Sequence, residues 1–465
     1  MTANKRTATD PAPLLPAGSG RQGDPGTTPD TNRFTTPQIR QMLQRQWGDV
    51  LLQRLEVIGG IAARLGTPAY LVGGCVRDLL QNRPAPDLDL AIEGDVRALA
   101  ESPPLQQPHA QCQLHPRFGT ATLRYPDGFR LDFARCRIEH YPAPATLPEV
   151  RPGDIHSDLA RRDFTINAMA VDLNPTTFGE LLDPHGGRAD LRQGLLRVLH
   201  AGSFLDDPTR ILRGLRFAVR FQFRLEKGTR ALLREALAQD ILARLSGARL
   251  WRELQYLLEL SDLPIALERL GAWRLWPLLR PEPADMESLL VRIRRGHQEI
   301  DWFRRHCPDE TLFDAAVWLT ILWRDIPWTE AEKRLHYWPV AGGHRILRDL
   351  RLLPDMPGAL TRADRPSAAG RLWERLSLPG LLALCAEYPE TDIMVESGHQ
   401  HLRRQRWLSS PLNGKELQAL GLTPGPRLGE VLERLRNARL DGEIKDKETA
   451  RQWLIGQGIL PSIQP

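Results

Sequence analysis

Hydrophobic and polar positions follow two different patterns along this chain. Residues 36–65 carry apolar side chains at helical spacing, which predicts one long amphipathic helix. Up to about residue 200, short runs of β character alternate with Gly, Pro and Asp turns. These runs are AYLVGG, PDLDLAIEG, GTATLRY, FRLDFARC and NAMAVDL. After Asp206 the pattern is helical almost throughout, so we expect an α+β protein with a small mixed-sheet head followed by helical segments.

The tryptophans lie almost entirely in the helical part. Eleven of the 12 follow residue 250, among Leu and Arg at helical spacing. Such residues are more often core anchors of helical subdomains than stacking surfaces for nucleic-acid bases. The first 35 residues, rich in Thr, Pro, Gly and Asp, are expected to form a disordered leader.

Composition narrows the class of protein only slightly. A chain of 465 residues is too long for one hydrophobic core. Only six of the 62 basic residues are Lys, and an arginine excess suits phosphate binding, although a codon-biased genome explains it equally well. Five scattered cysteines without a Cys-x-x-Cys pair indicate a reducing cytoplasm and argue against a zinc site. The sequence shows neither a secretion signal nor an apolar run long enough to span a membrane.

The segment YLVGGCVRDLL reads as a buried strand, a glycine turn and a helix start. Gly73 and Gly74 allow a turn that a side chain would obstruct, and a helix N-terminus attracts anions. Arg77 can reach the same anion, with Asp78 orienting its guanidinium. A tight turn without a ligand is the alternative, and the glycine pair alone does not decide between them.

Two aspartates in the next strand indicate a metal site. Asp87 and Asp89 are two residues apart, so on a strand both side chains leave the same face and can converge on hard cations. Asp132, in a later strand, is a candidate third carboxylate. Three such groups beside a phosphate turn would make a two-Mg²⁺ site for phosphoryl or nucleotidyl transfer. A solvated pair on an edge strand is the alternative for Asp87 and Asp89.

Two further stretches combine arginines with aspartate. Arg161, Arg162 and Asp163 offer cations for a triphosphate and an acceptor for a ribose, or simply a capped helix start with surface arginines. Asp207 precedes Pro208 in a favourable N-cap arrangement and begins the stretch DDPTRILRGLRFAVRF. Helical spacing places four arginines on one face of that stretch, opposite an apolar face: Arg210, Arg213, Arg216 and Arg220.

Together these motifs resemble those of the bacterial class II CCA-adding tRNA nucleotidyltransferases and their poly(A) polymerase relatives. The family belongs to the DNA polymerase β-like nucleotidyltransferase superfamily. The shared order is Gly-Gly-x-Val-Arg-Asp, Asp-x-Asp, Arg-Arg-Asp-Phe-Thr-Ile-Asn-Ala and acidic-Asp-x-x-Arg, over residues 40–260. A weaker similarity to the C-terminal part of bacterial members covers residues 412–435, whose glycine turns would contact RNA or join two helices. One position departs from the pattern, because the first acidic residue of the last motif is usually Glu and is Asp206 here.

The resemblance implies a palm-like catalytic head at residues 36–200, a helical neck at 201–262, a body at 263–400 and a tRNA-binding tail at 401–465. It implies that Asp87 and Asp89 bind Mg²⁺, that the glycine pair and Arg77 meet the triphosphate, and that Arg162 and Asp163 meet the sugar. Asp207 and Arg210 would select the base. The candidate nucleotide-binding set also includes Arg161, Arg213 and Arg216, and the candidate catalytic set includes Asp132.

Hydrogen-bond chemistry explains how such a pair selects bases without a template. An Asp accepts from an exocyclic amine, and an Arg donates to ring nitrogen and carbonyl acceptors. Cytosine and adenine present an amine beside an acceptor, whereas uracil and guanine present a carbonyl and an N–H there. Unmatched buried polar groups make this difference strongly discriminating. The sequence thus predicts addition of C and A to tRNA 3′ ends from CTP and ATP.

Three alternatives stay open on the sequence. The enzyme would add only CC or only A, it would be a poly(A) polymerase, or the fold would serve as a non-catalytic RNA-binding protein. Residues 138–158 lie where the family carries a flexible loop linked to the final A step, but their length and proline content do not decide whether that step occurs. The oligomeric state is not readable from the sequence.

Overall fold

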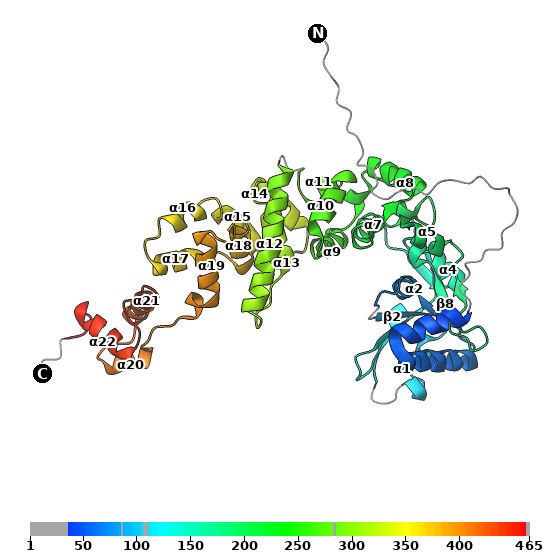
Figure 1. Ribbon diagram of the computed structural model, residues 1–465, viewed down its shortest axis with the longest axis horizontal. Coiled ribbons are helices and arrows are strands. Elements are labelled where there is room, and N and C mark those ends of the chain that lie inside the picture. Colours follow the sequence, from blue (N-terminus) through cyan, green and yellow to red (C-terminus); the bar gives the residue numbers. More distant parts are fainter. Residues whose placement is uncertain (1–35, 85–86, 106–109, 282–284, 462–465) are drawn as a thin grey trace, which may run out of the picture.

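The computed structural model describes residues 36–84, 87–105, 110–281 and 285–461, without the side chains of residues 87 and 104. The expected leader therefore lies outside the described residues. The chain is elongated, with a mixed sheet at one end and helices extending from it to the C-terminal end (Figure 1). The expected α+β class is confirmed, as is the order of a sheet followed by helices.

A seven-stranded mixed sheet holds the motifs of the N-terminal part. Its order is β3-β4-β5-β2-β1-β8-β9, and β2 pairs with β5 in parallel while the other neighbours are antiparallel. The strands are β1 (Ala69–Val72), β2 (Asp87–Ile92), β3 (Gln111–His115), β4 (Thr120–Arg124), β5 (Arg130–Arg135), β8 (Ala170–Asp172) and β9 (Leu181–Leu182). Two smaller sheets pair β6 (Arg137–His140) with β7 (Glu149–Pro152), and β10 (Leu195–Leu196) with β11 (Arg224–Leu225). All five runs of expected strand character contain strands.

The two faces of the sheet are covered differently. Leu88, Leu90 and Phe133 point into the large core, where α1 (Thr36–Leu65) and α3 (Val96–Ala100) pack on the sheet. The expected helix at 36–65 is confirmed, with a kink at Gly48. On the other face a small apolar cluster packs against α4 (Ile155–Ala160), and the rest of this face is left to polar side chains.

The remaining helices lie near the sheet or form the elongated C-terminal part. Those near the sheet are α2 (Gly74–Leu80), α5 (Gly187–Gln193), α6 (Ser203–Asp206), α7 (Thr209–Arg220), α8 (Lys227–Ala238), α9 (Gly247–Leu258), α10 (Leu263–Ala272) and α11 (Trp276–Leu279). Farther along lie α12 (Met286–His306), α13 (Asp314–Leu322), α14 (Trp328–Tyr337), α15 (Gly343–Leu352), α16 (Met356–Thr361), α17 (Pro366–Trp373), α18 (Leu378–Cys385) and α19 (Ile393–Arg403). The C-terminal end contains α20 (Gly414–Ala419), α21 (Pro426–Leu440) and α22 (Lys447–Gly456). Short 3₁₀ turns lie at Pro103–Leu105, Pro116–Phe118, Thr165–Asn167, Ile241–Arg244 and Gln405–Trp407.

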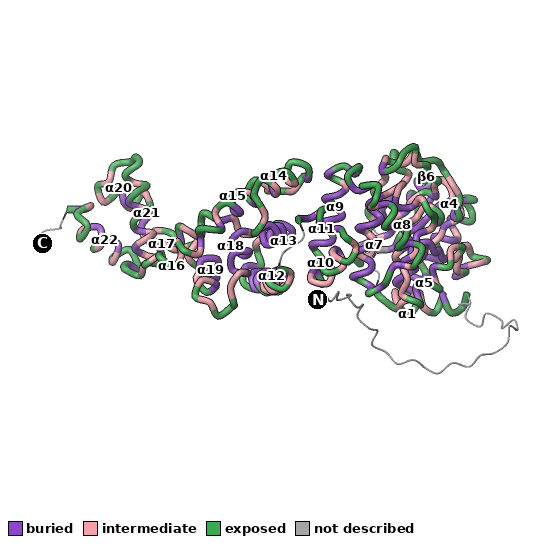
Figure 2. The backbone as a smooth tube through the Cα atoms, turned by 90° about the horizontal axis from the view of Figure 1, so that it is seen from above, coloured by how far each residue is buried: buried purple, intermediate pink, exposed green. Residues whose placement is uncertain are grey.

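Two hydrophobic cores divide the described helical part. The large core runs from the sheet through α19, and most of the C-terminal tryptophans are buried in it, Trp318, Trp323 and Trp373 almost completely. Trp328 and Trp407 are exposed. A separate small core from Leu412 to Leu460 joins α20, α21 and α22, which form a distinct lobe at the C-terminal end (Figure 2). None of the described helices is both long and apolar enough to cross a membrane.

Candidate active site

Strands β2 and β5 bring two carboxylates together on the polar face of the sheet. Asp89 is exposed between the buried Leu88 and Leu90, as the alternation along a strand requires. In the parallel register Asp89 is the partner of Asp132, so both side chains leave the same face. The Asp132 carboxylate accepts hydrogen bonds from Thr122 Oγ1 at 2.6 Å and from Arg130 Nη2 at 3.2 Å. The side chain of Asp87 lies outside the described part of the chain, so its predicted convergence with Asp89 stays a prediction.

The glycine turn before α2 makes room for a neighbouring arginine. Gly73 has a φ of +77°, and a Cβ there would lie 2.6 Å from Arg162 Nη1. Only glycine meets both conditions without strain. Three residues into α2, Arg77 is buried and each of its guanidinium nitrogens donates to a neighbour. Nε and Nη2 bond the Asp78 carboxylate at 2.8 and 2.9 Å, and Nη1 bonds Asn167 Oδ1 at 2.6 Å. Asp78 therefore orients Arg77, as the sequence suggested.

Arg161 and Arg162 are held by the buried carboxylate of Asp158. Arg161 Nη2 lies 2.6 Å from Asp158 Oδ1, and Arg162 Nη2 lies 2.8 Å from Asp158 Oδ2. Burial alone would raise the pKa of Asp158, but the two guanidinium groups outweigh it and hold the pKa below its usual range. Arg162 Nε is buried and has no hydrogen-bond partner among the described residues. A buried donor without a partner is costly, so this arginine is suited to an incoming anion.

Asp163 connects the sheet domain to α7. Its Oδ2 accepts from Arg213 Nε at 2.9 Å and Nη2 at 2.7 Å, and its Oδ1 accepts from Asn167 Nδ2 at 2.9 Å. Burial acts to raise the pKa of Asp163, but Arg213 and the hydrogen bonds outweigh it, so the pKa lies below its usual range. Asp163 is therefore a fixed anion, and its position is set by a residue 50 positions later in the chain.

Asp207 and Arg210 stand at the start of α7. Asp207 Oδ1 accepts from the backbone N–H of Thr209 at 3.0 Å and from Arg249 Nη2 at 2.8 Å. The N-cap of α7 is Pro208, one residue later than expected, although Asp207 still accepts from the backbone N–H of Thr209; Asp207 also lines the cavity described below. Arg210 is 4% exposed and donates to Ser203 Oγ at 2.6 Å and to the carbonyl oxygen of Arg161 at 2.7 Å. The bond to Arg161 fixes Arg210 relative to the sheet domain, whereas the contacts of Asp207 tie it to α7 and α9.

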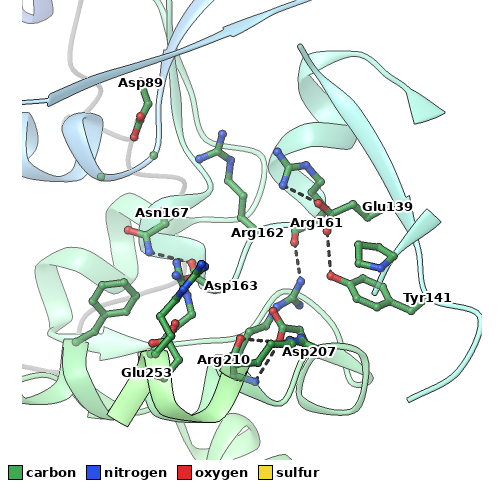
Figure 3. Close-up of a pocket in the computed structure, with 18 of the residues that line it drawn as sticks. Asp89, Glu139, Tyr141, Arg161, Arg162, Asp163, Asn167, Asp207, Arg210 and Glu253 are labelled. Atoms are coloured by element: carbon green, nitrogen blue, oxygen red, sulfur yellow. Dashed lines mark hydrogen bonds and ion pairs between the residues drawn. The ribbon is translucent and has the colours of Figure 1, made fainter. Parts of the chain in front are cut away.

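A cavity of about 700 Å³ connects these groups. Asp89 lies at one end, Asp207 and Arg210 lie at the other near the start of α7, and Arg162 and Asp163 lie between them (Figure 3). Eight arginines and five carboxylates line it, which favours an anionic ligand. The candidate residues that line it are Gly73, Gly74, Arg77, Asp89, Arg161, Arg162, Asp163, Asp207, Arg210 and Arg213. Asp132 lines an adjoining cavity that shares Asp89, Arg161 and Arg162 with the first.

Two candidates from the sequence lie away from the main cavity. Arg216 turns to Glu253, with Nη1 3.4 Å from Oε2, and its guanidinium also covers the ring of Tyr256. Asp206, the departure from the family pattern, lies 3.9 Å from His200 Nε2 and outside the lining of the cavity.

Sequence reasoning missed five charged residues that line the cavity: Arg137, Glu139, Arg249, Arg252 and Glu253. The carboxylate of Glu139, on β6, accepts hydrogen bonds from Arg137, Arg161 and the hydroxyl of Tyr141. Glu253 on α9 is 7% exposed, and burial raises the pKa of its carboxyl group. Arg249, also on α9, bonds Asp207. Glu253 and Arg249 lie four residues apart, so the helical pattern could have predicted that they share one face of α9. No sequence pattern indicated a role for Glu139.

The donor set fits a hard cation. Carboxylate oxygens are the ligands that Mg²⁺ prefers, and Asp89 and Asp132 present carboxylates on one face of adjacent strands. No group of three His, Cys, Asp or Glu side chains able to hold a metal occurs among the described residues, from which the Asp87 side chain is missing. All five cysteines are free thiols.

Comparisons with known proteins agree with this geometry. The model of the poly A polymerase head domain matches residues 69–197. The A-adding tRNA nucleotidyltransferase of Halalkalibacterium halodurans is 33% identical over 418 residues, 86% of this chain and 91% of that protein. The CC-adding tRNA nucleotidyltransferase of Deinococcus radiodurans is 32% identical over 424 residues, 88% and 96% of the two chains.

One curated relative is much longer than this chain, and solved structures share the fold of this chain. The chain spans 47% of the length of the A-adding enzyme of Geobacter sulfurreducens, to which it is 30% identical. The structure of the Thermotoga maritima CCA-adding enzyme complexed with tRNA is similar with a TM-score of 0.71 and 29% identity, covering 90% of this chain and 98% of that one.

Proposed function

Because this chain belongs to the bacterial tRNA nucleotidyltransferase and poly(A) polymerase family, we propose that it adds C and A nucleotides to the 3′ end of tRNA. The substrates are CTP and ATP, and no nucleic-acid template is used. The 3′ hydroxyl of the RNA attacks the α-phosphate, a new P–O bond forms, and pyrophosphate leaves.

One observation carries the proposal. A single cavity lined by eight arginines joins Asp89, on the polar face of the sheet, to Asp207 and Arg210 at the start of α7. A nucleoside triphosphate needs these features in this order: a carboxylate for the metal, cations for the phosphates, and a donor and acceptor pair for the base. A non-catalytic RNA-binding protein would have no need for an exposed carboxylate at the floor of such a cavity.

Each part of the chain contributes a separate role in this proposal. Asp87 and Asp89 hold Mg²⁺, with Asp132 beside them, and the bound ion supplies charge stabilisation to the transferring phosphoryl group. Arg162 donates from its guanidinium group to the triphosphate, and Asp163 accepts from the sugar. Asp207 accepts from the exocyclic amine of C or A, and Arg210 donates to the adjacent acceptor.

A narrower output is the second candidate. Relatives named as A-adding and as CC-adding match nearly the whole chain at 33% and 32% identity. Both outputs use the same cavity chemistry, because C and A present the same amine and acceptor arrangement to the Asp207 and Arg210 pair. We therefore propose C or A addition to tRNA as the shared function and leave the number of steps to experiment.

The test is incubation of a tRNA transcript that lacks CCA with CTP, ATP and Mg²⁺, followed by sequencing of the 3′ ends. Transcripts ending in CC serve in a parallel reaction that isolates the A step. The incorporation rate of the variant Asp89→Asn should be at least about 10³-fold lower than that of the wild type, because a metal ligand acts mainly in the transition state. Its affinity for tRNA should stay within about twofold, since a single neutralised carboxylate removes no phosphate contact. Incorporation by Asp89→Asn at the wild-type rate would refute the assignment.

A further inference from the structure

A second arginine-lined cavity, of about 1030 Å³, lies between α8, β11 and the end of α10. It shares no lining residue with the candidate active site. In Figure 1, α8 and α10 lie along the upper edge of the molecule, away from β2 and α2. We call this cavity the arginine groove, and its cationic lining residues are Arg224, Arg230, Arg234, Arg269 and Arg274.

The charge of the arginine groove is one-sided. Its lining contains no carboxylate among the residues that the structure describes. Arg230 and Arg234 are one turn apart on α8, both exposed, and like charges at this spacing destabilise a helix. A neighbouring cavity shares Arg224, Arg230 and Arg234 and extends the basic surface to Arg197 and Lys227. Among the described residues that line this neighbouring cavity, Glu226 is the one carboxylate, and it lies 3.5 Å from Arg197.

The end of α10 places an arginine at a strained position. The N–H of Leu275 bonds the carbonyl oxygen of Leu270 at 2.8 Å, and that of Arg274 bonds Gly271 at 2.8 Å, which is the Schellman pattern of helix termination. Arg274 occupies the left-handed residue of this pattern, with a φ of +60°, where glycine is normally found. Strained residues persist where the surrounding structure or a function requires them. Here the strained residue, Arg274, contributes its cationic side chain to the lining of the groove.

Trp273 supplies an aromatic surface beside these cations. Its half-buried side chain lines the groove, next to Arg269 and Arg274. Arg269 has its pKa lowered by burial and donates to the carbonyl oxygen of Phe223 at 3.2 Å. Cations along a groove with an aromatic ring are the features that bind a single nucleic-acid strand without sequence preference.

We propose that the arginine groove binds the sugar–phosphate backbone of RNA at a site separate from the candidate active site. Its guanidinium groups contact successive phosphates, and Trp273 stacks on a base. The choice of RNA over other polyanions rests on the proposed function. The occupant is an unpaired single strand of RNA, and the two probes below distinguish an unpaired stretch of the tRNA substrate from another RNA.

The test measures RNA affinity of the full chain by fluorescence anisotropy over a series of salt concentrations. The probes are a tRNA transcript lacking CCA and a short unstructured single-stranded RNA. Arg230→Gln/Arg234→Gln should weaken binding and lower the slope of log K against log salt by about 1.4, because each phosphate contact to a single strand contributes about 0.7. The matched control is Arg45→Gln/Arg64→Gln, which removes the same charge from exposed positions on α1.

A second variant separates binding from folding. Arg274→Gly removes a groove cation and restores the residue that the helix end prefers, so it should raise the melting temperature while weakening RNA binding. A loss with the tRNA probe alone assigns the groove to the substrate tRNA, and a loss with both probes assigns it to RNA in general. Affinities equal to those of the control pair, or polyglutamate competing as well as RNA, would overturn the proposal. Failure of nucleotide incorporation by the wild-type chain would refute the proposed function and leave the anisotropy result to decide the groove.

Discussion

At the scale of single residues, Gly73 makes room for the guanidinium group of Arg162. Gly73→Ala should cost about 1–3 kcal/mol of stability, the usual penalty for a side chain in a sparsely populated backbone conformation such as the φ of 77° and ψ of −131° of this residue. It should also displace Arg162, because the new Cβ would lie 2.6 Å from Nη1. We expect a rise in the KM for CTP or ATP beyond what unfolding explains. The measurement is steady-state incorporation alongside thermal denaturation.

Gly128→Ala provides the matched control for this change. Gly128 has a φ of +88°, and no atom lies within 4 Å of its would-be Cβ. It should therefore show the backbone penalty without the change in KM. Equal kinetic effects of the two substitutions would mean that Gly73 serves only the turn.

Arg210 is expected to act in base choice. Arg210→Gln should relax the preference for CTP and ATP over UTP and GTP by about 10- to 100-fold, the effect of losing one or two matched hydrogen bonds. The preference is measured as the ratio of kcat/KM values. Arg252→Gln removes an exposed arginine from the same cavity and should weaken triphosphate binding without changing that ratio. An unchanged base preference in Arg210→Gln would count against the proposed selection mechanism.

The sequence predicted individual site residues where a motif compresses the chemistry into a short stretch. Asp89, Arg162 and Arg210 all belong to such stretches, and all three line the cavity. Glu139 could not be found in this way, because its partner Arg161 lies 22 positions away and only the fold brings them together. The sequence spacing also could not predict the contact of Arg216. Four arginines share one helix face, and only the fold shows that Glu253, on another helix, pairs with Arg216.

At the scale of elements, the contact between α7 and the sheet domain sets the geometry of the cavity. Gly214 on α7 faces Phe164, and a Cβ at residue 214 would lie 2.8 Å from the ring carbon Cζ. Phe164 is fully buried and cannot move aside. This close approach places Arg210 and Arg213 of α7 in the same cavity as Asp163.

Gly214→Ala should therefore destabilise the protein. Overpacking against Phe164 costs about 1–3 kcal/mol. The better helix propensity of Ala offsets only roughly 1 kcal/mol of that cost. It should also lower kcat/KM, because α7 moves away from Asp163. Gly370→Ala on α17 is the control, since its would-be Cβ meets no atom within 4 Å and the helix should become more stable. Chemical denaturation and incorporation kinetics check both, and a stabilised Gly214→Ala would contradict the tight contact.

Element prediction from the sequence succeeded for strands with alternating or continuous apolar residues and failed for others. Strand β3 (Gln111–His115) is at the edge of the sheet, where most of its residues remain partly exposed and polar, so its pattern resembles a loop. The β6 and β7 hairpin was treated as part of a proline-rich loop. The hairpin is also supported by tertiary contacts such as that of Glu139 with Arg161, which intrinsic strand propensity does not contain.

At the scale of the whole molecule, the C-terminal lobe is connected to the rest of the chain mainly through polar contacts. Asp441 on the lobe accepts hydrogen bonds from the backbone N–H and the hydroxyl of Ser367, both at 2.8 Å. Arg436 Nη2 lies 2.5 Å from Glu374 Oε1. The lobe has its own core, and the candidate active site lies at the opposite end of the chain's long axis (Figure 1). A part so placed can extend the grip on a long RNA without touching the chemistry.

Removal of residues 408–465 should consequently separate binding from catalysis. We expect incorporation into a short acceptor-stem minihelix to stay within about twofold, because the truncation leaves the large core and the cavity intact. The KM for full-length tRNA should rise at least about tenfold, equivalent to roughly 1.4 kcal/mol of lost binding. Asp441→Ala keeps every basic residue of the lobe but loosens the attachment of the lobe. Its KM for full-length tRNA should therefore lie between those of the wild-type chain and the truncated chain. A minihelix rate that drops as far as the full-length tRNA rate would show that the lobe shapes the active site from a distance, against the separation of roles proposed here.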